Sequence, residues 1–143
     1  MKNETLETAL LLSSIGLPMF ECRGKVPAAK EWQAATSPEP QTAATWQSYG
    51  LACGRNSGFW VLDIDTKNGQ PGLQNLTALE AEYGPLPATM VVETPSGGRH
   101  YYFRFEEGLR IANRAGDIAA GVDVRGHDEA GEPLGYVCGP GSQ

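Results

Sequence analysis

The chain has 143 residues, 41% of them hydrophobic and 20% charged, a composition typical of one globular domain. A chain of this length buries roughly two-thirds of its unfolded surface on folding, so its core needs neither disulfides nor a structural metal. The 17 acidic residues outnumber the 11 basic ones, giving a formal net charge of −6. This balance argues against a stand-alone DNA-binding protein, because affinity for a phosphate backbone depends on basic contacts. It is compatible with an enzyme whose carboxylates collect divalent cations.

Cysteine usage and the N-terminal segment indicate the cellular compartment. Cys22, Cys53 and Cys138 lie far apart and lack the CxxC spacing of a zinc site, so they are predicted to be free, reduced thiols. The apolar run within residues 1–20 is interrupted by serines, a glycine and a proline, which is typical of neither a signal peptide nor a membrane span. We therefore expect a cytoplasmic protein.

The first third of the chain predicts two helices and one strand. Asn3 is expected to cap a helix that ends at Gly16. A short apolar strand follows at 18–22. Residues 24–40 are rich in Lys, Ala, Ser and Pro and predict a loop, within which Ser37 caps a second helix that reaches Ser48.

The rest of the chain alternates short apolar or β-branched runs with glycines, a pattern that predicts strands. These runs cover 51–53, 59–65, 90–94, 100–105, 122–125 and 136–138. Between the second and third runs, Leu76, Leu79 and Tyr83 recur at helical spacing before Gly84, and predict one amphipathic helix over 72–83. A hairpin is expected around 95–98.

This order of elements predicts the α+β class, with a mixed or antiparallel sheet and flanking helices on one face. We expect a single domain over residues 1–143. Its N-terminal helical and strand module would cover 1–50, and the sheet with the chemically active residues would cover 51–143.

Two aspartates stand at the end of the predicted strand 59–65. Asp63 and Asp65 share one face with Val61, because successive strand side chains point to opposite faces. Two carboxylates at this spacing, followed by a polar turn, offer hard oxygen ligands for Mg²⁺ or Mn²⁺. Aspartates at strand ends also cap turns or face water, and the pair alone does not decide between these interpretations.

A glycine-containing turn over 94–100 joins two predicted strands. Its paired glycines can adopt positive φ and let a ligand approach the backbone closely, which suits an anion. Beyond the turn, His100, Tyr102 and Arg104 share one strand face, and the aromatic residues of the other face are predicted to be core. The alternatives are an ordinary hairpin turn and a hydrogen-bonded strand histidine.

A third cluster lies in residues 121–126. Asp123 and Arg125 share a strand face, so a carboxylate and a guanidinium project together while the two valines of the strand pack inward. By itself this cluster is explained by a simple ion pair on a short strand. The functional hypothesis rests on the three clusters together.

Together, the three clusters resemble the motifs of the archaeo-eukaryotic primases, in the same order, and specifically those of the primase-polymerase domains of plasmid and phage replication proteins. The motif residues are Asp63-Ile64-Asp65, Ser96-Gly97-Gly98-Arg99-His100 and Val122-Asp123. The flanks are similar as well: residues 24–27 with Trp32 and Trp46, Gly54 with Ser57 and Gly58, and residues 135–137 with Pro140 and Ser142. The resemblance covers most of the chain.

The resemblance implies an RRM-like catalytic core and DNA primase and DNA polymerase activity. In that reaction a 3′-hydroxyl attacks the α-phosphate of a nucleoside triphosphate and expels pyrophosphate. Asp63, Asp65 and Asp123 would be catalytic and would hold two Mg²⁺ or Mn²⁺ ions. The implied nucleotide-binding residues are Ser96, Gly97, Gly98 and His100, with Arg99, Arg125 and Lys67 as weaker phosphate contacts.

The same resemblance implies partners for the chain. They are a single-stranded DNA template, nucleoside triphosphates, and a fused or associated helicase; no membrane partner is expected. Because the chain stops soon after the third motif, we expect it to be a fragment of a longer protein.

Three other functions use some of these residues. A metal-dependent nuclease also needs clustered carboxylates, but it has no need of a serine-glycine-histidine clamp for a triphosphate. A nucleotide-sugar transferase can use an Asp-x-Asp pair on a metal, and the third carboxylate would then be coincidental. A non-catalytic module that only binds nucleotide or DNA would retain all the motifs by accident.

Overall fold

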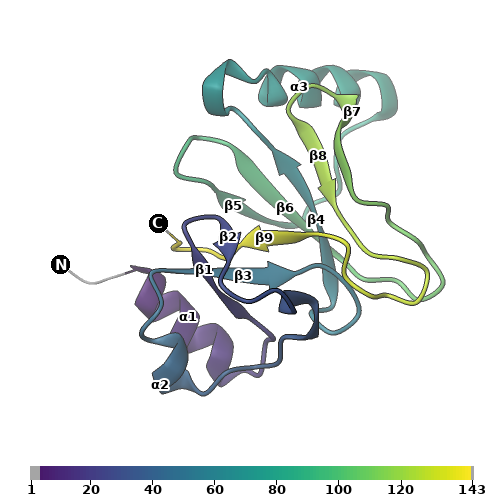
Figure 1. Cartoon of the computed structure of the whole chain (residues 1–143). Coiled ribbons are helices and arrows are strands. Elements are labelled where there is room, and N and C mark those ends of the chain that lie inside the picture. The colour runs from purple at the N-terminus through teal and green to yellow at the C-terminus, as the bar shows by residue number, and fades with distance from the viewer. Residues whose placement is uncertain (1–3, 143) are drawn as a thin grey trace.

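Two antiparallel sheets form the framework of the structure, a computed structural model that describes residues 4–142 (Figure 1). The helices are α1 (Glu4–Ser14), α2 (Pro40–Ala43) and α3 (Gly72–Tyr83), with short 3-10 turns η1 (Trp32–Ala34) and η2 (Lys67–Gly69). The strands are β1 (Phe20–Arg23), β2 (Val26–Pro27), β3 (Ser48–Ala52), β4 (Phe59–Ile64), β5 (Met90–Glu93), β6 (Arg99–Arg104), β7 (Arg114–Ala119), β8 (Val122–Arg125) and β9 (Tyr136–Cys138). The α+β class is confirmed.

The smaller sheet has the strand order β2-β1-β3-β9, and the larger sheet has the order β5-β6-β4-β8-β7. The expected hairpin is present, because β5 and β6 pair antiparallel across the turn. The smaller sheet takes three strands from the start of the chain and β9 from its end, so it combines both predicted parts, 1–50 and 51–143. None of the helices within residues 4–142 is long and apolar enough to cross a bilayer.

One face of the larger sheet packs against α3. Leu62 and Ile64 of β4 form a core there with Leu76 of α3. The valines of β8 and the aromatic residues Tyr101 and Phe103 of β6 pack on the same core, as their strand positions predicted. Alternation therefore directs Val61 and Asp63 to the opposite face.

The opposite face of the larger sheet meets the smaller sheet. Val61 and Tyr102 pack there with Tyr49, Leu51 and Val137 of β3 and β9. Residues of α1 and α2 complete this core. The polar residues that continue the same strand face are thereby placed beside the smaller sheet.

The structure corrects the predicted helix between Ser37 and Ser48. The helix is only α2, and the chain then enters β3 at Ser48. Pro40 occupies the first helical turn, where its missing N–H costs nothing, and Glu39 before it is extended, with ψ of 140°, as the residue before a proline prefers. The Ser37 hydroxyl donates instead to the Ser13 carbonyl. The predicted cap at Asn3 lies outside the described residues.

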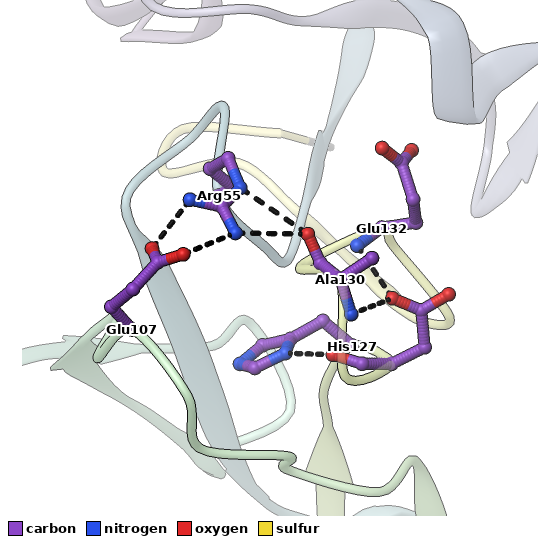
Figure 2. Close-up of polar contacts among 6 residues, drawn as sticks. Arg55, Glu107, His127, Ala130 and Glu132 are labelled. Carbon is purple, nitrogen blue, oxygen red and sulfur yellow. Dashed lines mark hydrogen bonds and ion pairs between the residues drawn. The ribbon is translucent and has the colours of Figure 1, made fainter.

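Arg55 joins three segments near the start of β4, at the end of that strand away from Asp63 (Figure 2). Its guanidinium forms an ion pair with Glu107 and donates to the Ala130 carbonyl, at 3.2 Å from Nε. Within the loop, Asp128 accepts a hydrogen bond from the Ala130 amide at 2.9 Å, and the Asp128 carbonyl lies 2.8 Å from Nδ1 of the buried His127. These contacts fix the acidic loop that leads from β8 to β9.

Candidate active site

The register of β4 brings three polar side chains into one row. Asp63 lies directly opposite His100 of β6 on one side and directly opposite Asp123 of β8 on the other. Directly opposed residues in antiparallel strands share a face, with Cβ atoms about 5 Å apart. Two residues far apart in sequence thus flank the first aspartate of the Asp-x-Asp pair.

The row is held by charge-assisted contacts. His100 Nε2 lies 3.3 Å from Asp63 Oδ1, and one terminal nitrogen of Arg125 lies 3.5 Å from Asp63 Oδ2 and 3.3 Å from Asp123 Oδ2. Burial would raise the pKa of Asp63, but the hydrogen bond and charge of His100 and the charge of Arg125 together hold that pKa below its ordinary value. Asp63 is therefore a carboxylate at neutral pH.

Asp65 lies just beyond the end of β4, where three segments converge. Its Oδ1 accepts a hydrogen bond from the Lys67 amide at 2.8 Å, and its own amide donates to the Gly121 carbonyl at 2.8 Å. A Cβ on Gly72, the first residue of α3, would lie 2.4 Å from the Asp65 carbonyl oxygen. Glycine at 72 thus lets the helix start against the strand end that carries this carboxylate.

A cavity of about 1040 Å³ is lined by the row and by residues from both sheets. This volume is at the upper end of the range for small-molecule sites. The sequence-predicted residues that line it are Asp63, Asp65, Lys67, Ser96, His100, Asp123 and Arg125. The structure thus gathers residues of all three motifs around one space.

The remaining predicted residues lie in or after the β5–β6 turn. The Gly97 amide donates to the Thr94 carbonyl within the turn, and Gly97 has φ of 87°. A Cβ on Gly98 would lie 2.3 Å from the Ile64 carbonyl oxygen, so glycine lets the turn pack on the end of β4. The side chain of Arg99 is not part of the cavity lining; its Nη1 donates to the Tyr101 hydroxyl at 3.0 Å.

We call His100, Asp63 and Asp123 the carboxylate row. Its two aspartates have the donor chemistry of a Mg²⁺ or Mn²⁺ site, because both ions prefer carboxylate oxygens. Within residues 4–142, no group of three or more His, Cys, Asp or Glu residues is arranged as a metal site. The contacts of Arg125 give a physical reason, since its guanidinium lies between Asp63 and Asp123 and supplies the cation that both carboxylates need.

The sequence analysis assigned no role to a second group of residues that lines the cavity. Lys25, Trp32, Tyr136 and Cys138 line it, and all come from the part of the chain that forms the smaller sheet. The only available signal was that residues 24–27, Trp32 and residues 135–137 belong to the similar flanks.

Three comparisons with known proteins bear on the family to which the chain belongs. The search of curated proteins and the search of solved structures gave no significant match. The model of the family described as "Bifunctional DNA primase/polymerase, N-terminal" matches residues 9–143, which include every residue of the carboxylate row. The chain therefore belongs to the bifunctional DNA primase/polymerase N-terminal family.

Proposed function

We propose that this domain is a DNA-templated nucleotidyltransferase that acts in plasmid or phage replication and joins nucleotides by two-metal phosphoryl transfer. Family membership supports a primase and polymerase function. The observation that carries the finer proposal is the alignment of His100, Asp63 and Asp123 across β6, β4 and β8 beside one large cavity.

Asp63, Asp65 and Asp123 would hold the Mg²⁺ or Mn²⁺ ions. When bound, such ions lower the pKa of the attacking 3′-hydroxyl and neutralise charge on the attacking and leaving oxygens. The depressed pKa of Asp63, which burial opposes and His100 and Arg125 produce, keeps that ligand ionised.

The chain's basic and hydroxyl groups bind and orient the triphosphate. Ser96, Lys67 and His100 line the same cavity as the carboxylates and offer donors to phosphate oxygens. Arg125, which also lines the cavity, would be free to contact the phosphates if a metal ion took its place between Asp63 and Asp123. The 3′-hydroxyl oxygen would then form a bond to the α-phosphorus, its proton would pass to water, and the bond from the α-phosphorus to the pyrophosphate oxygen would break, so that pyrophosphate leaves.

One incubation tests the proposal. The protein is mixed with Mn²⁺ or Mg²⁺, labelled nucleotides, and primed or unprimed single-stranded DNA. Extended primers or new oligonucleotides support the polymerase and primase. Shortened strands indicate a nuclease, and binding without turnover indicates a non-catalytic module; either result alone refutes the proposal.

A further inference from the structure

Part of the cavity lining is aromatic. Trp32 of η1 and Tyr136 of β9 both line the cavity and are half-buried, with ring centroids 5.0 Å apart in an edge-on arrangement. Phe20 of β1 is buried beside them, at 5.5 Å from Trp32 and 5.6 Å from Tyr136. The cluster therefore has a packed base and a partly accessible surface.

A lysine stands beside these rings. Lys25 follows Gly24, which has φ of 62°, in the two-residue turn between β1 and β2. The Tyr136 hydroxyl donates to the Lys25 carbonyl at 2.7 Å, so the tip of this hairpin is tied to β9. The Lys25 side chain is exposed, lines the cavity, and forms no ion pair within the described residues 4–142.

The residues on β9 lie near the charged groups of the carboxylate row. Burial raises the pKa of Tyr136, and the charge of Arg125 acts in the opposite direction. Cys138, two residues further along β9, is reached by the charges of His100 and Asp63. All of these residues line the same cavity, so one ligand can contact the aromatic rings and approach Asp63.

We propose that Lys25, Trp32 and Tyr136, which we name the stacking wall, bind a nucleobase and the phosphate next to it. Aromatic faces beside a positive charge are the usual means of holding unpaired nucleotides without reading their sequence. The base belongs either to the DNA template strand or to the incoming nucleotide, since both must reach the carboxylate row. The inference rests on the proposed nucleotidyltransferase function and adds the surface that positions the substrate.

Binding measurements with matched variants test the stacking wall. Trp32→Leu keeps apolar bulk against Phe20 but removes the ring, and Trp60→Leu is its control, because Trp60 is half-buried, stacks on Phe103 and does not line the cavity. Lys25→Gln has Lys30→Gln as its control, since Lys30 is exposed and also outside the cavity lining.

The probes are a fluorescein-labelled oligothymidylate of about 12 nucleotides and an abasic oligonucleotide of the same length, both with Mn²⁺. Trp32→Leu should weaken binding of the oligothymidylate roughly 5- to 100-fold and leave binding of the abasic strand unchanged. Lys25→Gln should weaken binding of both strands. It should also reduce the slope of log affinity against log salt concentration by about 1, the amount expected for one lost phosphate contact. Both control variants should bind like the wild type.

Calorimetric titration with dTTP separates the two sources of the base. If the variants lose affinity for the oligonucleotide alone, the stacking wall binds the template. If they also lose affinity for dTTP, it binds the incoming nucleotide. The inference is overturned if folded Trp32→Leu binds the oligothymidylate within about twofold of the wild type, or loses both strands equally. If Trp32→Leu does not fold, wild-type affinity of the exposed-site variant Lys25→Gln overturns it.

The readout is separate from catalysis. A wild type that binds through the stacking wall but incorporates no nucleotide refutes the polymerase and leaves the wall in place. If the wild type incorporates nucleotides and the stacking-wall variants bind DNA as the wild type does, the inference about the stacking wall is refuted and the proposed polymerase function stands.

Discussion

His100 of β6 lies directly opposite Asp63 of β4, and its Nε2 is 3.3 Å from Asp63 Oδ1. His100 is only 9% exposed, yet its partner is a carboxylate of the cavity and not an apolar core. The histidine thus stabilises the charged form of Asp63 and lines the same cavity. Mutation of each partner should therefore affect activity more than folding.

Asp63→Asn should abolish nucleotide incorporation while the fold survives. The amide keeps the shape of the side chain but removes the charge on which both metal binding and the Arg125 contact depend. Incorporation is measured by primer extension and folding by thermal melting. Asp117→Asn on β7 is the control, because that carboxylate is exposed and outside the cavity lining. Full activity of Asp63→Asn would show that Asp63 is not a catalytic metal ligand.

His100→Ala should weaken nucleotide binding by about 1 to 3 kcal/mol, the usual loss for a charge-assisted hydrogen bond. The melting temperature should change little, since Asp63 keeps its contact with Arg125. Calorimetric titration with a nucleoside triphosphate and Mn²⁺ checks the affinity. A large melting loss with unchanged nucleotide affinity would instead make His100 a structural residue.

The local pattern of the sequence was sufficient to predict the elements that carry the site. The period-2 alternation in residues 59–65 and 122–125 placed Asp63 on the face opposite to Leu62 and Ile64, and Asp123 on the face opposite to the two valines of its strand, as the core against α3 shows. Helical spacing of leucines gave α3 its observed bounds, Gly72–Tyr83. These features depend only on neighbouring residues, so a single sequence contains them.

Features set by long-range pairing could not be predicted. Nothing near Tyr136 indicates that β9 joins β3 in the smaller sheet and not the strands of the motifs, because strand partners are chosen by three-dimensional packing. The edge strand β7 was missed since Arg114–Ala119 is almost wholly exposed and has no apolar alternation. The shared strand face already suggested an ion pair between Arg125 and Asp123, but the contact of Arg125 with Asp63 on the neighbouring strand appears only in the structure.

Arg125→Gln should destabilise the protein without metal, because Asp63 and Asp123 then face each other with no intervening cation. We expect a loss of roughly 1 to 3 kcal/mol, seen as a lower melting temperature in EDTA. Mn²⁺ should restore more stability to this variant than to the wild type. Arg114→Gln, which removes an exposed guanidinium, is the control. If Mn²⁺ does not change the melting temperature of Arg125→Gln, Arg125 and the metal ion do not share a site.

Cys138 should be the most reactive thiol. A hydrogen bond from Cys22 lowers its pKa to about 7 against the effect of burial, with help from the charge of Lys25, whereas burial raises the pKa of Cys53 to about 12. The rate of alkylation by iodoacetamide should therefore rise with pH to a plateau above about 7 at Cys138, with little labelling of the buried Cys22 and Cys53. Peptide mass spectrometry measures each site.

Because Cys138 lines the cavity, a bound nucleotide with Mn²⁺ should slow its alkylation. Cys138→Ser should remove the reactive site and leave the other two thiols protected. Preferential labelling of Cys22, or labelling of Cys138 that is indifferent to nucleotide, would contradict this arrangement.

The net charge of −6 predicts that the domain binds single-stranded DNA feebly unless metal and nucleotide are present. Its 11 basic residues are spread along the chain without a basic run, so few phosphates can be neutralised at once, and the acidic majority repels the DNA backbone. Divalent ions at the carboxylate row remove part of that repulsion, and a bound triphosphate offers a base with which the template can pair. Fluorescence anisotropy at about 150 mM salt, where the Debye length is about 8 Å, should therefore show affinity rising when Mn²⁺ and nucleotide are added. A tight complex that is independent of metal would falsify this prediction, because it would require a basic surface that the charge distribution does not provide.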